Sequence, residues 1–277
     1  MKRTLLYRSL IIITLVGLIS SCGNSPTIIE EDSDLTSNDT ISEQLTEIIT
    51  QFKMPSPIEV YITLWEDEAR FTKEALNPTE NVNKYNTTAK KAINLGIYAS
   101  DVAYCSVYDK NQLTMGYFAA SKKLADDLGL AEGFDDKFMS RITDNLDNAD
   151  SLYTISNESY IQATSYLQNN GQTQLLPYIT FGGWIESVHL IISSVKTYNE
   201  NSTVIQMLND QGPLLENLVD YFKSLGSNND IKDIYSDLQS LQDIYDKSLD
   251  NESGIISKEQ FNEIKSKISE IRSKWSN

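Results

Sequence analysis

The stretch INLGIYASDVAYCSVY, residues 93–108, decides the fold. At helical spacing it carries two stripes of side chains, and neither stripe has the lysines and glutamates of a solvated surface. The first stripe consists of Ile93, Ile97, Ser100, Tyr104 and Val107, and the second of Asn94, Tyr98, Asp101, Cys105 and Tyr108. A helix without a solvated face is surrounded by other elements, so we predict that residues 93–108 form the central helix of the protein.

The rest of the chain also has helical periodicity. Apolar residues recur every three or four positions in nearly every segment, no segment shows sustained alternation, and the 277 residues include only six prolines. The fold class is therefore predicted to be all-α, a multi-helix antiparallel bundle of about eight to ten helices. Before the last two, the expected helices are Ile41–Lys53, Pro57–Leu76, Val82–Tyr108, Gln112–Leu128, Phe134–Leu146, Ser151–Gln168, Gln174–Tyr198 and Thr203–Leu225.

The last part of the chain, about 229–277, is predicted to be a helical hairpin. Its second helix begins at a capping box made by Ser257 and Gln260, with Ile256 placed to pack against Phe261. Two apolar stripes face the same way across a turn at 250–254. They contain Ile231, Ile234, Leu238, Leu241 and Tyr245 in the first helix, and Phe261, Ile264, Ile268, Ile271 and Trp275 in the second.

Glycines mark helix ends and one helix interior. Gly129, Gly171 and Gly226 each follow a periodic run, where a left-handed residue closes a helix. Gly182 and Gly183 instead lie inside an apolar run, where each costs about 1 kcal/mol relative to alanine. This pair predicts either a close approach of two helices or a local break opposite Trp184 that makes room for a ligand.

The first residues have the pattern of a secretory leader. Lys2, Arg3 and Arg8 precede an apolar run, Ser9 to Ile19, that is too short to span a bilayer, and the leader closes with Ile19-Ser20-Ser21-Cys22. This ending resembles the lipobox of bacterial lipoprotein precursors. The resemblance implies cleavage of residues 1–21, a lipid on the Cys22 sulfur and a membrane anchor through that lipid.

Residues 22–40 are predicted to be a flexible acidic tether, because they contain too few apolar groups to offset the entropy of ordering them. The acidic Glu30-Glu31-Asp32 is similar to export signals of surface-exposed lipoproteins. Residues 41–277 are expected to form the helical domain. Loss of the three basic leader residues takes the formal net charge from −16 to −19, which excludes binding to nucleic-acid phosphates.

Asp101 is the first candidate site residue. One hypothesis is a polar pocket in which Asp101 is the acidic group and Tyr98, Tyr104 and Tyr108 form the walls. The other hypothesis is a sealed hydrogen-bond network, in which tyrosine hydroxyls are the expected donors to Asp101.

Glu186 and His189 form a Glu-x-x-His pair on one helix face beside Trp184, which gives the second candidate site. In di-iron helical proteins such pairs come in twos, and His189 is the only histidine of the chain. With two cysteines and one histidine, neither a metal nor a cofactor is expected. We therefore expect His189 to pack in or beside the core, with Glu186 as a hydrogen-bond partner.

Other chemistries lack their motifs. The sequence has no Gly-x-Ser-x-Gly elbow and no glycine-rich phosphate loop. The pairs Asp126-Asp127 and Asp135-Asp136 are interpreted as solvated charges at helix ends.

Five segments between Asn94 and Val195 resemble uncharacterised helical lipoproteins of the Bacteroidota: NLGIYASDVAY, KKLADDLGL, FDDKF, DNLDNADSLY and GGWIES. The resemblance implies an envelope location, at the outer membrane, and no activity. The first functional hypothesis is a lipid-anchored accessory protein that binds another envelope protein. The alternatives are a small-ligand-binding or hydrolytic protein that uses Asp101, Glu186 and His189, and a purely structural spacer.

Overall fold

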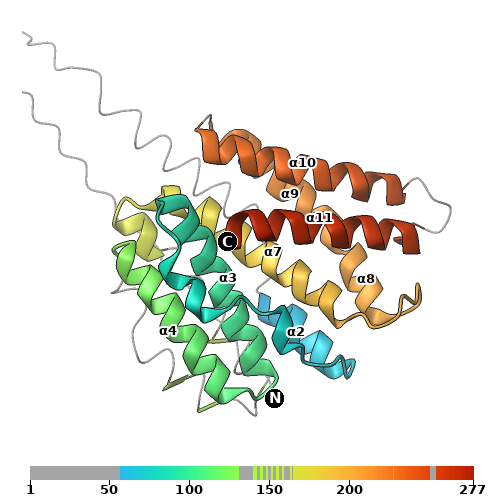
Figure 1. Ribbon diagram of the computed structural model, residues 1–277, viewed down its shortest axis with the longest axis horizontal. Coiled ribbons are helices and arrows are strands. Elements are labelled where there is room, and N and C mark those ends of the chain that lie inside the picture. Colours follow the sequence, from blue (N-terminus) through green and yellow to red (C-terminus); the bar gives the residue numbers. More distant parts are fainter. Residues whose placement is uncertain are drawn as a thin grey trace, which may run out of the picture.

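A computed structural model describes residues 57–130, 165–226, 228–249 and 254–277, together with scattered positions between 140 and 163. The described residues form α-helices and short 3-10 helices and contain no strand (Figure 1). The predicted all-α bundle is confirmed. The leader, Cys22, the tether, the expected helix Ile41–Lys53 and most of the helices expected at Phe134–Leu146 and Ser151–Gln168 lie outside the described residues.

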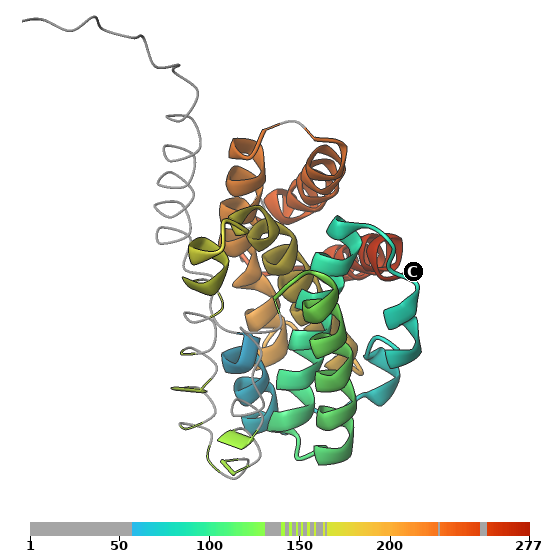
Figure 2. The same cartoon turned by 90° about the vertical axis from the view of Figure 1, so that its left-hand side faces the viewer.

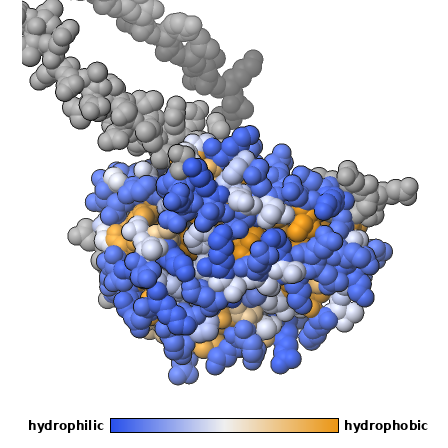
Figure 3. Space-filling model, turned by 45° about the horizontal axis from the view of Figure 1, so that its top comes forward, coloured by the Kyte–Doolittle hydropathy of each residue, from blue (hydrophilic) through white to orange (hydrophobic). Residues whose placement is uncertain are grey.

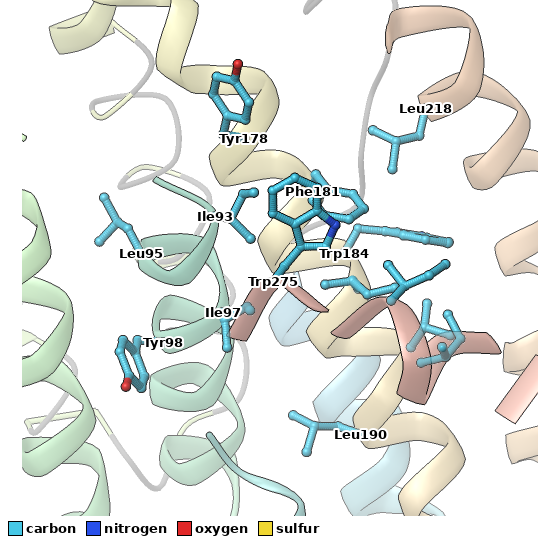
Figure 4. Packing of buried hydrophobic residues seen from close by; sticks show 14 of the residues in the cluster. Ile93, Leu95, Ile97, Tyr98, Tyr178, Phe181, Trp184, Leu190, Leu218 and Trp275 are labelled. Carbon is cyan, nitrogen blue, oxygen red and sulfur yellow. The ribbon is translucent and has the colours of Figure 1, made fainter. Parts of the chain in front are cut away.

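Two helices form the centre of the bundle, α3 (Thr88–Val107) and α7 (Leu176–Ser194). Both stripes of α3 are buried, and of their ten residues only Tyr108, just past the helix end, is partly exposed. Figure 4 shows α3 and α7 side by side, with Trp184, Phe181 and Trp275 gathered where α7 meets the last helix. The prediction of a central helix at residues 93–108 is confirmed.

Glycines let these two helices pack backbone against backbone. A methyl group on Gly182 would overlap the carbonyl oxygen of Ile93, and one on Gly96 would overlap that of Ile179. Because α7 is continuous through Gly182 and Gly183, close approach is the correct alternative and the local break is wrong.

The other helices surround this pair (Figures 1 and 2). Helix α4 (Asn111–Asp127) packs on α3, and α2 (Pro57–Glu66) touches both central helices. Helices α8 (Thr203–Asn209) and α9 (Gln211–Ser224) follow α7 and pack against it.

The C-terminal hairpin is confirmed as α10 (Asn229–Leu249) and α11 (Lys258–Ser276). All ten predicted stripe residues are buried, and the capping box of Ser257 and Gln260 is present. The two helices run antiparallel in Figure 1, and α11 also packs on α7 and α3.

Two expected helices are shorter than the pattern suggested. The helix expected to reach Leu76 ends at Glu66, and the one expected from Val82 begins at Thr88, after the cap Thr87. Between them runs a connection without α-helix, residues 67–87, which we call the strap. It includes short 3-10 helices at Lys73–Ala75 and Thr79–Asn83, and its apolar residues pack into the core without forming α-helix.

The helix expected at Thr203–Leu225 is broken after Asn209. Pro213 has no N–H, so it cannot donate the hydrogen bond to Asn209 that a continuous helix requires. The three closing glycines behave as predicted, since Gly129, Gly171 and Gly226 have φ angles of 75°, 64° and 86°.

In the described part of the chain, one helical stretch, Thr173–Ser194, is long and apolar enough to cross a membrane. Its most apolar window is 78% buried by the rest of the protein, as a core helix is.

Candidate functional site

Asp101 of α3 and Glu186 of α7 lie in the centre of the molecule, and neither side chain is exposed to solvent. Arg272 of α11 reaches Glu186 with two hydrogen bonds, from Nε to Oε2 at 2.5 Å and from Nη2 to Oε1 at 2.8 Å. This is a bidentate ion pair, and it joins the C-terminal hairpin to the central helix. Arg272 was not singled out by the sequence.

The strap covers this centre. Arg272 Nη2 also donates to the carbonyl oxygen of Ala75 at 3.0 Å, and His189 Nε2 lies 3.2 Å from the same oxygen. Two residues later, the backbone N–H of Asn77 donates to Asp101 Oδ2 at 3.2 Å. The structure thus brings Asp101, Glu186 and His189 together around residues 75–77.

The three tyrosines expected to surround Asp101 hold the strap instead. Tyr108 donates to the carbonyl of Ala69 at 2.9 Å, and Tyr98 to that of Pro78 at 2.9 Å. Tyr104 accepts the backbone N–H of Thr72 at 3.0 Å. The expectation that tyrosine hydroxyls donate to Asp101 is therefore wrong, because loop peptide groups left without helical partners compete for these hydroxyls.

Amide side chains extend the network to the end of α11. Asn77 Nδ2 donates to Tyr85 at 3.0 Å and to Asn94 Oδ1 at 3.3 Å. Tyr85 and Asn94 donate in turn to the backbone carbonyls of Ser276 and Trp275, at 3.1 and 2.8 Å. The polar residues of α3 therefore fix both the strap and the C-terminal turn.

A second polar group lies between α2, α3 and α7. The hydroxyl of Tyr61 contacts those of Ser100 and Ser187, and Ser187 donates to the carbonyl of Gly183 at 2.8 Å. Ser100 and Ser187 are 3.2 Å apart. These buried hydroxyls satisfy one another, which stabilises the packing of α2 across both central helices.

Trp184 is on a different side of α7. Its indole Nε1 donates to Oε1 of Gln211 at 3.2 Å, at the start of α9. The structure therefore separates Trp184 from Asp101 and assigns it to the packing of α9.

Burial dominates the electrostatics of this centre. It raises the pKa of Asp101 well above its usual range, the charge of Glu186 raises it further, and Arg272 and the N–H of Asn77 act in the opposite direction. Burial lowers the pKa of His189, although Glu186 opposes this shift. Burial raises the pKa of Tyr104 to about 12, and it raises the pKa of the Cys105 thiol. At neutral pH, His189 is therefore uncharged, and its Nε2–H donates to Ala75.

These observations favour the sealed network over an open pocket. Both carboxylate oxygens of Glu186 accept hydrogen bonds from Arg272, and Oδ2 of the buried Asp101 accepts the backbone N–H of Asn77. Among the described residues, no group of three or more histidine, cysteine, aspartate or glutamate side chains is arranged to hold a metal ion. A surface hollow of about 340 Å³ contains none of the predicted site residues; it is lined by Arg141, Asn145, Asn148, Ser151, Thr154 and Ile155.

Sequence reasoning missed Arg272, Asn77 and Tyr61. A buried glutamate needs a cation, but the chain has 23 lysines and arginines, and no local pattern selects one of them. Asn77 precedes Pro78, which signals an extended residue at the end of a helix or in a loop, and this was the available clue.

The carboxylates Asp126 and Asp127 behave as interpreted, at the end of α4. Asp127 pairs with Lys91 at 3.1 Å and with Lys123 at 3.4 Å, and these partners, Lys91 first, lower its pKa. Asp135 and Asp136 lie outside the described residues. Comparisons of the chain with protein-family models, with curated proteins and with solved structures returned no match.

Proposed function

We propose that the chain is a lipoprotein of the cell envelope, held at the outer membrane by a lipid on Cys22, which acts by binding a partner protein. The leader pattern and the lipobox at residues 19–22 support the anchor. The tether of residues 22–40 would give the helical domain reach from the membrane surface.

One observation carries the binding role. The ionisable side chains that sequence reasoning placed in a catalytic or ligand site make internal contacts: Asp101 and Glu186 are fully buried, Asp101 accepts the N–H of Asn77, and Glu186 pairs with Arg272. Buried groups that connect elements in this way stabilise the fold. We therefore expect contacts with other molecules to be made by side chains on the surface.

The surface suits a protein partner better than a membrane face or a nucleic acid. The face in Figure 3 is mostly hydrophilic, with separate small apolar areas. The formal net charge, −16 for the full chain and −19 without the three basic leader residues, repels phosphate and anionic headgroups, and it favours a partner with a complementary basic surface.

A small-ligand or hydrolytic function is the second candidate, and the convergence of Asp101, Glu186 and His189 favours it. In this case the strap must first move, because it covers all three side chains. A ligand of this kind would be recognised by a change in hydrogen exchange at residues 67–87.

The anchor is tested by the Cys22→Ser variant in the native host. We expect the wild-type protein to sediment with outer membranes and to incorporate a labelled fatty acid, and the variant to do neither, because its residue 22 has no thiol to modify. A variant that still sediments with membranes and carries the label would contradict the anchor.

The binding role is tested by crosslinking intact cells and purifying the lipoprotein. We expect the same envelope protein to be recovered with the wild type and to be lost when exposed acidic residues of α10, such as Asp233 and Asp243, are replaced by asparagine. Recovery that is independent of these charges would argue against electrostatic complementarity.

A further inference from the structure

Two buried carboxyl groups share one cation at the centre of this protein. Asp101 and Glu186 have no solvent exposure, and both lie against one segment of the strap, Asp101 at Asn77 and Glu186, through Arg272, at Ala75. Arg272 uses its Nε and Nη2 groups on Glu186 and on Ala75. If both carboxyl groups were ionised, the cluster would contain one uncompensated negative charge.

The hydrogen bonds of Asp101 point to the same imbalance. Its Oδ2 accepts the N–H of Asn77, whereas its Oδ1 is buried and has no donor to accept from. An unsatisfied carboxylate oxygen is costly in the interior, but a carboxylic acid can donate an O–H from that position. Glu186, the neighbouring carboxyl group that pairs with Arg272, is the acceptor that we assign to this proton.

The other ionisable groups that act on Asp101 do not supply a second cation. They are Tyr61 from α2 and Tyr117 from α4, and on α3 itself Tyr98, Tyr104 and Cys105. Burial raises the pKa of all five, so they are neutral at physiological pH. The nearby His189 is neutral too, because burial lowers its pKa.

We propose that Asp101 and Glu186 share a single proton, donated from Asp101 Oδ1 to Glu186, and that this proton keeps the strap closed over the core. Loss of the proton sets two carboxylates against each other between α3 and α7, directly beneath Asn77 and Ala75. The strap is the element that opens, since side-chain hydrogen bonds hold its peptide groups at residues 69, 72 and 78 and it contains no α-helix. The device is a pH-sensitive latch, and it is independent of the lipid anchor.

The direction of the pH effect follows from linkage. A carboxyl whose pKa is raised on folding binds its proton more tightly in the folded state than in the unfolded state. The stability that it contributes is complete below the unfolded pKa of about 4 and is lost as the pH rises towards the folded pKa. A salt-bridged surface aspartate behaves in the opposite way.

The protonation state can be read directly in the wild-type protein. With aspartate labelled by ¹³C at the side-chain carboxyl, we expect one resonance at the position of a carboxylic acid at neutral pH, and we expect it to be missing from Asp101→Asn. If the Asp101 resonance titrates near pH 4 like an ordinary aspartate, the shared proton is ruled out. This measurement does not depend on whether any variant folds.

The Asp101→Asn variant tests the consequence for stability. Asparagine can donate an N–H to Glu186 and accept from Asn77, so it imitates the protonated acid at every pH. Compared with this variant, the wild type is expected to lose stability as the pH rises from about 4, with a slope of up to one proton. A difference that does not change with pH would overturn the proposal.

Asp127→Asn is the matched control. Asp127 pairs with Lys91 and Lys123, and its pKa is lowered. The wild type is therefore expected to lose its advantage over this variant as the pH falls below about 4, the reverse of the Asp101 result.

Hydrogen exchange locates the movement. At about pH 9 residues 67–87 are expected to exchange faster in the wild type than in Asp101→Asn, and at about pH 4 equally in both. The two proteins are compared with each other at the same pH, so the effect of pH on the chemical exchange rate cancels. Equal exchange of this segment at both pH values would show that the strap is not the element that opens.

Discussion

At the scale of single residues, one buried ion pair connects distant elements within an otherwise apolar interior. The Glu186–Arg272 pair connects α7 to α11, and the same guanidinium fixes the strap through Ala75. Burial lowers the pKa of Arg272, but the charge of Glu186 and its hydrogen bonds outweigh this and raise it. Arginine suits this position because its planar fork can satisfy a carboxylate and a peptide carbonyl at once.

Glu186→Gln is expected to be strongly destabilising. It removes the buried carboxylate that accepts both hydrogen bonds of the Arg272 pair, and breaking a buried pair from one side costs about 3–5 kcal/mol. The measurement is urea denaturation of both proteins at neutral pH.

Glu270→Gln is its control, in the same chemistry but on the surface, because Glu270 pairs with Lys267 and is 67% exposed. Little change is expected there, since exposed pairs contribute little. Similar losses for both variants would argue against a special role of the buried pair.

At the scale of elements, the crossing of α3 and α7 depends on two glycines from different helices. Gly96 and Gly182 each leave room for a carbonyl oxygen of the other helix, so the backbones approach closely. Helix propensity alone disfavours glycine at both positions, and the packing of the two central helices is the compensating gain.

Gly182→Ala is expected to lower stability by about 1–3 kcal/mol or more, because the new methyl group overlaps the backbone of Ile93 and the helices must move apart. Gly116→Ala is the matched comparison. Gly116 lies on the exposed side of α4 with nothing near its Cβ position, so alanine there is expected to stabilise by up to about 1 kcal/mol. Thermal unfolding of the two variants and the wild type is the measurement. The midpoint temperature is expected to fall for Gly182→Ala and to rise for Gly116→Ala.

At the scale of the molecule, the described helices are joined into one core. The apolar stripes of the C-terminal hairpin do not by themselves show whether it folds with the rest of the chain. Its polar contacts do: Arg272 pairs with Glu186 of α7, and the carbonyls of Trp275 and Ser276 accept hydrogen bonds from Asn94 and Tyr85. These contacts span 86 to 191 positions of sequence, so the hairpin is an integral part of the bundle.

Unfolding in urea is therefore expected to be a single transition. Tryptophan fluorescence reports on α2, α7 and α11 through Trp65, Trp184 and Trp275, while far-ultraviolet circular dichroism reports on all helices. The two signals should give the same midpoint and slope. Separate midpoints would indicate that the hairpin unfolds independently.

Much of the fold could be predicted because its causes are local. The stripe from Phe261 to Trp275, the Ser257–Gln260 capping box and the closing glycines depend on residues only a few positions apart, and all are found as predicted. The strap could not be predicted in this way, since Phe71, Ala75 and Leu76 continue the helical spacing of α2. Hydrogen bonds that Tyr98 and Tyr108 donate to its carbonyls, and that Tyr104 accepts from its Thr72 N–H, override that local preference.

The candidate site too could be predicted only where its causes are local in sequence. The two-striped pattern of residues 93–108 was enough to place Asp101 in the interior. That Asp101 meets Glu186, that Arg272 is the cation, and that the tyrosines hold a strap were decided by tertiary structure. Burial and helical form follow from neighbours along the chain, whereas the partner of a buried charge is set by which distant segments pack together.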